Sequence, residues 1–308
     1  MSQGKALQAK GAFASLQYRK TRDRIIELVL LAAGMVAVFT TMAIVFILFY
    51  ESSFFFEHVS VKDFITDTMW TPLFADARYG IMPLVAGTLT VTGVAVLVAI
   101  PVGTIIAIYL SEFAPHHLRE SVKPVLELLG AVPTVVYGYF ALLMVTPLLQ
   151  KVWPELPGFN MLSAGLVIGL MIVPYVASVS EDAMRAVPKY MREGSYAMGA
   201  TKMQTALRVV VPGAFSGLAA AYILGISRAV GETMVVAIAA GMMANLTFNP
   251  TEPAATITAY IVQVSLGDLP HDSIGYQSIF AAGLVLMLMT LVLNVIGFFL
   301  TRRFREAY

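Results

Sequence analysis

Two oppositely charged residues, Arg228 and Glu232, lie in the middle of a long apolar stretch of the chain. Each costs about 2.5–3.5 kcal/mol at the centre of a membrane helix, so charged residues there usually have a function. They are four residues apart, and on a continuous helix this spacing places both side chains on one face. The sequence therefore predicts an ion pair inside the membrane, which either lines a pathway or has a purely structural role.

A polar insert, residues 181–212, separates two apolar stretches. Pro188 suits the first turn of a helix and Gly199 suits its end, so we expect a short helix between them. That helix would combine apolar and charged side chains, which allows it to seat in the groove of a partner protein. The alternative is a solvated helix that lies on the lipid headgroups.

The spacing of Glu193, Gly199 and Pro212 in this insert resembles the "EAA…G…I-LP" signature of ABC-importer permeases. The departures are conservative, because Gly and Ser stand at the two Ala positions and Val stands at the Ile and Leu positions. In that family the loop contacts an ATPase subunit, and the resemblance implies the same contact here. The residues that it assigns to ATPase coupling are Glu193, Gly194, Ser195, Gly199 and Pro212.

The stretch around the charged pair also resembles a known family. Residues 227–234, Ser-Arg-Ala-Val-Gly-Glu-Thr-Met, are similar to the corresponding helix of permeases of the phosphate-specific ABC importer. Arg228 is the only Lys or Arg in the apolar spans away from their ends, and a guanidinium offers an oxyanion a planar set of donors. The resemblance implies a phosphate pathway in which Glu232 orients Arg228. The expected pathway residues are Arg228, Glu232, Ser227 and Thr233.

Three further segments, residues 87–89, 131–138 and 258–268, look like the PstC-type permease. The paired PstA-type permease shares the insert and a similar Arg…Glu motif, so the PstC assignment depends on these outer segments. The resemblance covers most of the chain and implies a MetI-like ABC importer permease fold. It also implies a PstA-type second permease, a PstB-type ATPase dimer and a PstS-type phosphate-binding protein as partners. We expect contact with membrane lipid and none with nucleic acid.

Catalytic chemistry has little support in the sequence. The chain has no cysteine and no P-loop pattern G-x-x-x-x-G-K-[ST], so ATP and Mg²⁺ are expected on the partner ATPase. We therefore expect a transport subunit, not an enzyme, with no catalytic residue, metal site or bound cofactor. The four histidines lie in expected loops, and the adjacent pair is poorly spaced for chelation: His58, His116, His117 and His271.

Two other transport functions stay open. A permease for another oxyanion would present the same residues. An ion-coupled secondary transporter would need no ATPase, but such proteins often carry inverted repeats, and the sequence shows no internal repeat.

The elements that must position these residues are long apolar helices. The chain has 308 residues, of which 58% are hydrophobic and 13% are charged, far from the composition of soluble domains. We predict an all-α integral membrane protein, since each span needs about 20 apolar residues. The six expected transmembrane helices are residues 25–49, 81–110, 122–149, 159–179, 213–244 and 278–301.

Prolines lie inside three of these spans. Pro101, Pro133 and Pro174 fall in the second, third and fourth expected helices. Proline removes a backbone donor and loosens the helical ladder. The prolines therefore predict kinks, which either line a path or serve ordinary packing.

Lys and Arg concentrate before the first span, in the second and fourth loops, and after the last span. The positive-inside rule places this side in the cytoplasm. We therefore expect a multi-pass protein of the cytoplasmic (inner) membrane with both termini inside. The expected parts are a basic cytoplasmic segment (1–24), a permease domain (25–301) with its coupling loop (181–212), and a cytoplasmic tail (302–308).

Overall fold

The computed structural model describes the backbone of residues 2–74 and 76–303, and the side chains of residues 20, 22–74 and 76–303. Within these ranges the regular secondary structure is helical, apart from one isolated β-bridge between Trp70 and Tyr79. Five described helices are long and apolar enough to cross a membrane, and a bent helix pair makes a sixth span if it is counted as one. The predicted all-α membrane fold is confirmed. The chain divides into two compact units, Met1–Glu51 and Ser52–Tyr308.

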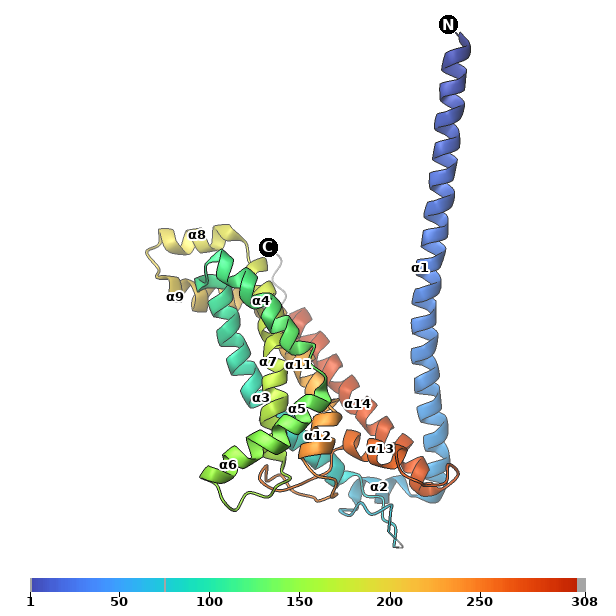
Figure 1. Ribbon diagram of the computed structural model, residues 1–308, viewed down its shortest axis with the longest axis vertical. Coiled ribbons are helices and arrows are strands. Elements are labelled where there is room, and N and C mark those ends of the chain that lie inside the picture. Colours follow the sequence, from blue (N-terminus) through green and yellow to red (C-terminus); the bar gives the residue numbers. More distant parts are fainter. Residues whose placement is uncertain (1, 75, 304–308) are drawn as a thin grey trace. The chain divides into compact units, whose positions relative to one another are not determined.

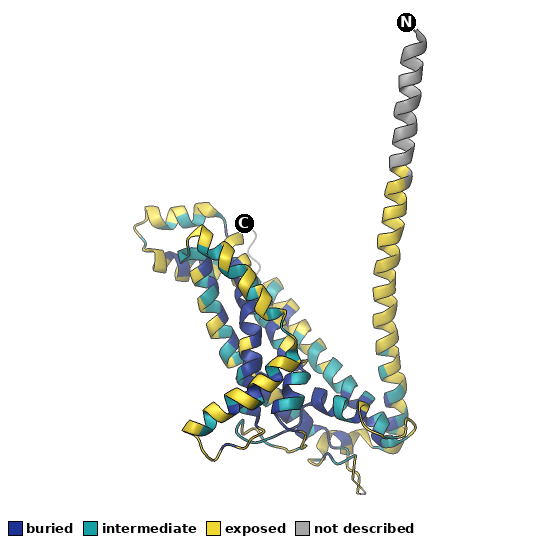
Figure 2. Cartoon of the chain, in the orientation of Figure 1, coloured by how far each residue is buried: buried dark blue, intermediate teal, exposed yellow. Residues whose placement is uncertain are grey.

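The first unit consists of α1 (Ser2–His58), which continues into the second unit. Its part from Arg22 to His58 is a candidate span in which none of the apolar window is buried. Figure 2 colours most of this part as exposed, and its exposed residues include many large apolar ones, which suits a helix in lipid. Most side chains of the expected basic segment, residues 1–24, lie outside the described residues.

The second unit is built around α7 (Met161–Ala186), the most buried of the candidate spans (Figure 2). α3 (Met82–Ile108) and α11 (Phe215–Val230) pack against it, and α14 (Ile274–Arg303) packs against α11 (Figure 1). Glycine permits the close approach of α7 to α3. A Cβ atom on Gly165 would lie 2.6 Å from the Val94 side chain, so a larger residue would separate the two helices.

The third expected span, residues 122–149, is wrong at its start. α4 (His116–Gly130) has no buried residue and ends before Pro133. A new direction begins with α5 (Thr134–Phe140), and the candidate span is Thr134–Val152 (Figure 1). Proline disfavours helical backbone at the residue before it, so Pro133 separates two helices instead of kinking one.

The fifth expected span, residues 213–244, is also wrong as a single helix. The residues before it, Lys202–Gly213, form a helix that meets α11 at a bend of 72°. α11 ends at Val230 with Gly231 as its C-cap, and α12 (Met234–Ala239) follows after a short break. The apolar residues after α12 are therefore outside a helix, and the charged motif occupies the break.

Three π-helical turns lie among the described residues: η1 (Tyr109–Phe113), η2 (Ala141–Val145) and η3 (Ala206–Val210). π-Helical turns are rare and frequently occur at functional sites. η1 continues α3 and contains Glu112. η2 leads into α6 (Thr146–Val152), and η3 joins α9 (Lys202–Thr205) to α10 (Val211–Gly213).

An aromatic core closes the end of the second unit that lies opposite the polar insert (Figure 1). The short helices α2 (Val61–Thr66) and α13 (Ile257–Ser265) border it. The Trp70 and Tyr260 rings meet edge to face at 5.0 Å between centroids, and the Tyr260 and Ser278 hydroxyls are 2.6 Å apart. The loop between α2 and α3 is therefore held by packing.

Candidate functional site

Arg228 is the exposed cation at the break after α11. It lies in the last turn of that helix, where the carbonyl ends carry partial negative charge and favour a cation. Its guanidinium lies over the ring of Tyr175 of α7, 5.9 Å from the centroid. Among the described residues it has no ion-pair partner within 4.0 Å. Its donors are therefore available to an anion.

The predicted ion pair between Arg228 and Glu232 is wrong. The pair requires a continuous helix, and α11 ends at Val230. The buried Glu232 carboxylate instead accepts hydrogen bonds from the backbone N–H groups of Met234 (3.1 Å) and Val235 (3.3 Å). A carboxylate at this position satisfies free N–H groups and complements the helix dipole, so Glu232 caps α12.

The break is fixed further by hydroxyl groups. Thr258 of α13 donates a hydrogen bond of 2.7 Å to the backbone carbonyl of Glu232, and Thr233 donates one of 3.1 Å to the carbonyl of Gly231. The hydroxyl of Ser227 is buried and has no partner among the described residues. A buried hydroxyl without a partner is destabilising by about 1–3 kcal/mol, so Ser227 is available for a further hydrogen bond.

The short helix predicted in the polar insert is confirmed as α8 (Lys189–Ala197), with Pro188 as its N-cap. Gly199 follows its C-cap with a φ of +82°, which glycine adopts without a steric penalty. Gly199 N–H donates to the Tyr196 carbonyl (2.9 Å), and Ala200 N–H donates to the Ser195 carbonyl (3.1 Å). This pair of bonds is a Schellman closure of the helix.

The other expected coupling residues are distributed over the insert. Glu193 and Gly194 are exposed on α8, and Pro212 is exposed on α10. The Ser195 hydroxyl lies 2.9 Å from the Thr205 hydroxyl, which joins α8 to α9. The insert is therefore a structured segment in which α8 contacts α9. The role of these residues in ATPase coupling stays a prediction.

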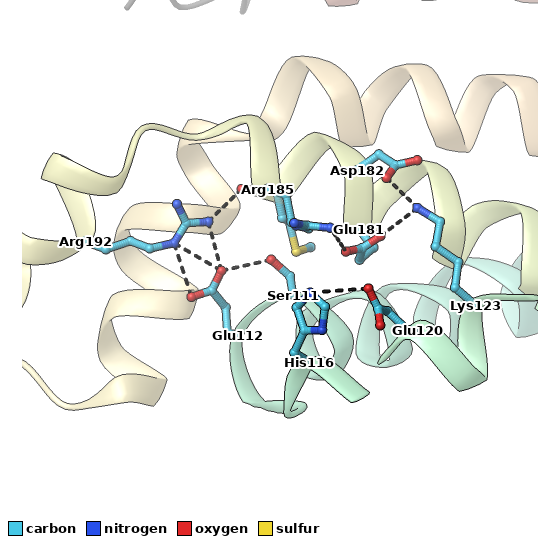
Figure 3. Close-up of polar contacts among 10 residues, drawn as sticks. Ser111, Glu112, His116, Glu120, Lys123, Glu181, Asp182, Arg185 and Arg192 are labelled. Carbon is cyan, nitrogen blue, oxygen red and sulfur yellow. Dashed lines mark hydrogen bonds and ion pairs between the residues drawn. The ribbon is translucent and has the colours of Figure 1, made fainter. Parts of the chain in front are cut away.

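An ion pair that the sequence analysis missed attaches α8 to the bundle (Figure 3). Arg192 Nη2 lies 3.0 Å from Glu112 Oε1, and only 16% and 5% of these two side chains are exposed. Arg192 also donates to the carbonyls of Met184 (2.8 Å) and Val187 (2.5 Å) at the end of α7. The Ser111 hydroxyl donates to Glu112 at 2.9 Å. We call the Arg192–Glu112 pair the α8 clamp.

A second ion-pair group joins α4 to α7 (Figure 3). Glu181 is fully buried, and its Oε2 lies 3.0 Å from Lys123 Nζ. Lys123 also pairs with Asp182 at 2.5 Å, and Arg185 Nη1 lies 3.6 Å from Glu181 Oε1. Burial opposes the charged form of Lys123, but the bonds and charges of Asp182 and Glu181 outweigh it, so the pKa of Lys123 lies above its ordinary value.

The fold and the candidate site together define the class of protein. Apolar candidate spans pack beside α11, which carries the exposed Arg228 and ends at a break. The polar helix α8 of the insert is held to the bundle by the α8 clamp. This is the arrangement of a membrane transport subunit. The chain belongs to the family described as "Binding-protein-dependent transport system inner membrane component", whose model matches residues 99–306.

Individual relatives agree with this family. The chain is 36% identical to the probable ABC transporter permease protein YqgH of Bacillus subtilis, over 82% of this chain and 81% of the relative. It is 34% identical to the phosphate transport system permease protein PstC 1 of Mycobacterium tuberculosis (78% and 76% covered) and 34% identical to PstC of Haemophilus influenzae (64% and 69%). The resemblance to PstC-type permeases is confirmed.

Solved structures support the fold. The inward-facing MetNI methionine ABC transporter matches with a TM-score of 0.54 at 18% identity, over 73% of this chain and 94% of that chain. A bacterial ABC transporter involved in import of the acidic polysaccharide alginate matches with a TM-score of 0.57 at 16% identity (82% and 87% covered). The MetI-like permease fold is therefore confirmed, and the chain is a multi-pass ABC importer permease of the inner membrane.

Proposed function

We propose that this chain is the permease subunit of an ATP-driven importer of inorganic phosphate and forms half of its translocation path. The observation that carries the proposal is the exposed guanidinium of Arg228, in a span that also matches phosphate permeases. A guanidinium can replace part of the hydration shell of phosphate with hydrogen bonds. The Ser227 hydroxyl, one residue earlier in the chain, is buried without a described partner and is the proposed neutral donor.

The geometry changes the role of Glu232. Its carboxylate caps α12, so it shapes the break and does not orient Arg228 directly. Backbone N–H groups therefore bind the Glu232 carboxylate, and the Arg228 guanidinium remains available to the substrate. Thr233 lies in the same break and completes the proposed set of pathway residues.

α8 is the proposed contact with the ATPase. Tyr190 and Met198 expose 64% and 88% of their surfaces, beside the exposed Glu193, so the helix offers a mixed surface to a groove. The α8 clamp and the Glu181 group connect this helix, through α7, to α3 and α4. A displacement of α8 by the ATPase would therefore move the helices that surround the path.

The proposed complex contains a PstA-type permease, a PstB-type ATPase dimer that binds ATP and Mg²⁺, and a PstS-type phosphate-binding protein. Both termini and the insert face the cytoplasm in this proposal. We expect Lys202→Cys to react with an impermeant thiol reagent from the cytoplasmic side only, and Asp268→Cys from the outside only, because both residues are exposed and the chain has no other cysteine. Labelling of both from one side would contradict the orientation.

The substrate is tested in proteoliposomes that contain the four components. We expect ATP-dependent uptake of labelled phosphate, and loss of that uptake in Arg228→Ala at equal amounts of assembled complex. Lys151→Ala, at an exposed lysine on α6, is the matched control and should transport normally. Uptake by Arg228→Ala equal to the wild type would contradict the pathway role.

A permease for a different oxyanion is the second candidate, because the name of YqgH gives no substrate and a guanidinium binds oxyanions in general. A competition experiment on uptake distinguishes a phosphate permease from a permease for a different oxyanion. Unlabelled phosphate should suppress the uptake of labelled phosphate, whereas sulfate should not. Transport of sulfate in preference to phosphate would support the second candidate.

A further inference from the structure

A cavity of about 550 Å³ lies beside α8, on the side of the bundle that holds the polar insert. Its wall is formed by η1, the start of α4, the end of α7 and α8. Four Lys or Arg side chains line it against two carboxylates. Since one of those carboxylates, Glu112, already bonds to Arg192, the cavity has an excess of positive charge.

The cations in the cavity are poorly neutralised. Among the described side chains, Arg119 and Lys189 have no ion-pair partner. Arg185 has a single one, the buried Glu181 at 3.6 Å, which Lys123 also contacts. Like charges that converge without partners repel one another, and a bound anion would relieve this repulsion.

Backbone groups add to the positive field. α4 begins at His116 and α8 begins at Lys189, and both residues line the cavity. Neither helix has a side-chain cap or an acidic residue in its first turn. Helix N-termini carry partial positive charge, and their free N–H groups bind phosphate in many proteins. Two such N-termini meet here with Arg and Lys side chains.

We propose that this cavity binds an anion that carries a phosphate group. The ligand is either free inorganic phosphate or the headgroup of an anionic phospholipid, which share this chemistry. The site is distinct from the proposed path, because its residues lie on the polar insert and around α4, whereas Arg228 is in the last turn of α11. The inference rests on the proposed function in placing the cavity on the cytoplasmic side, and the lining shares Glu193 of α8 with the proposed ATPase contact.

Equilibrium dialysis of the purified full-length chain in neutral detergent, against labelled phosphate at low ionic strength, tests the first source. Arg119→Gln and Lys189→Gln should each raise the dissociation constant about tenfold, the equivalent of one charged hydrogen bond. Lys202→Gln is the matched control, since this exposed lysine of the insert does not line the cavity, and it should bind normally. Arg228→Gln reports on the other site, because binding that this variant alone abolishes would belong to the proposed path.

Native mass spectrometry tests the second source, with the chain extracted from nanodiscs that contain phosphatidylglycerol or only phosphatidylcholine. Retained phosphatidylglycerol that is lost in Arg119→Gln and Lys189→Gln would assign the cavity to a headgroup. Phosphate binding with that mutational pattern would assign it to the free ion. Binding of both ligands that is unchanged in these variants, or lost only in Arg228→Gln, would overturn the proposal without affecting the transport test.

Discussion

Breaking the α8 clamp should lower the unfolding free energy of the chain and reduce the amount of phosphate transported per ATP hydrolysed. Replacing Arg192 by Met leaves the Glu112 carboxylate, only 5% exposed, with the Ser111 hydroxyl as its remaining described donor. Removing one partner of a buried pair costs about 3–5 kcal/mol of unfolding free energy. Glu112→Gln is milder, since Arg192 keeps its bonds to the Met184 and Val187 carbonyls, and we expect about 1.5–3 kcal/mol.

The measurement is a double-mutant cycle on Arg192→Met and Glu112→Gln, followed by unfolding of the purified chain in mixed micelles. The double variant should lose less than the sum of the single losses, with a coupling energy above about 1 kcal/mol. Arg185→Met is the comparison variant. Its guanidinium is 50% exposed and lies 3.6 Å from the buried Glu181, which keeps its ion pair with Lys123, so the loss should be smaller than in Arg192→Met. Additive single losses would refute the reasoning.

Transport provides the second part of this test. In the reconstituted complex, Arg192→Met should still assemble with the ATPase, because the exposed surface of α8 is unchanged. Phosphate moved per ATP hydrolysed should fall, since the side-chain bonds that hold α8 against η1 and the end of α7 are lost. An unchanged ratio would show that the clamp stabilises the fold without transmitting motion.

Gly199→Val places a β-branched residue at a φ of +82°, so it should lose about 1–2 kcal/mol of stability and lower substrate-stimulated ATP hydrolysis. Gly158→Ala is the control, because it lies outside the insert and its added Cβ meets no atom within 4 Å, and it should hydrolyse ATP normally. Glu232→Gln keeps a hydrogen-bond acceptor for the N-terminus of α12 and should retain most transport. Glu232→Leu removes the acceptor and should lose about 0.5–2 kcal/mol of stability. Equal unfolding curves for the two variants would contradict the capping role. Because the pKa of Lys123 is raised in the folded chain, its contribution to stability should be complete below pH 10.5 and disappear as the pH rises through the higher folded pKa. Lys123→Met should therefore be less stable than the wild type at pH 8. A difference in stability that disappears below pH 10 would refute this.

Much of the fold could be predicted because each membrane span needs a long run of apolar residues, which is visible in the sequence. Apolar length identified the bundle, and Pro188 and Gly199 identified both ends of α8. Hydropathy failed where an apolar stretch is interrupted by backbone geometry. Pro133 begins a helix, and Gly231 ends one, yet neither changes the average polarity of its segment.

The candidate site could be predicted as a set of residues but not as a set of contacts. Arg228 and Glu232 were identified because charge is rare in a span, whereas their pairing assumed a helix that ends at Val230. The α8 clamp was missed, because Glu112 and Arg192 are 80 residues apart and meet only through packing. Long-range pairing of this kind has no signal in a single sequence.

The π-helical turn η1 makes the helical register of Glu112 sensitive to chain length. A π turn accommodates an extra residue within an otherwise α-helical ladder, and each residue of an α-helix turns the next side chain by about 100°. Deleting one residue between Tyr109 and Ser111 would let the ladder revert to α and rotate Glu112 away from Arg192, with almost no change in composition. Insertions and deletions at this point should therefore be tolerated far less than substitutions.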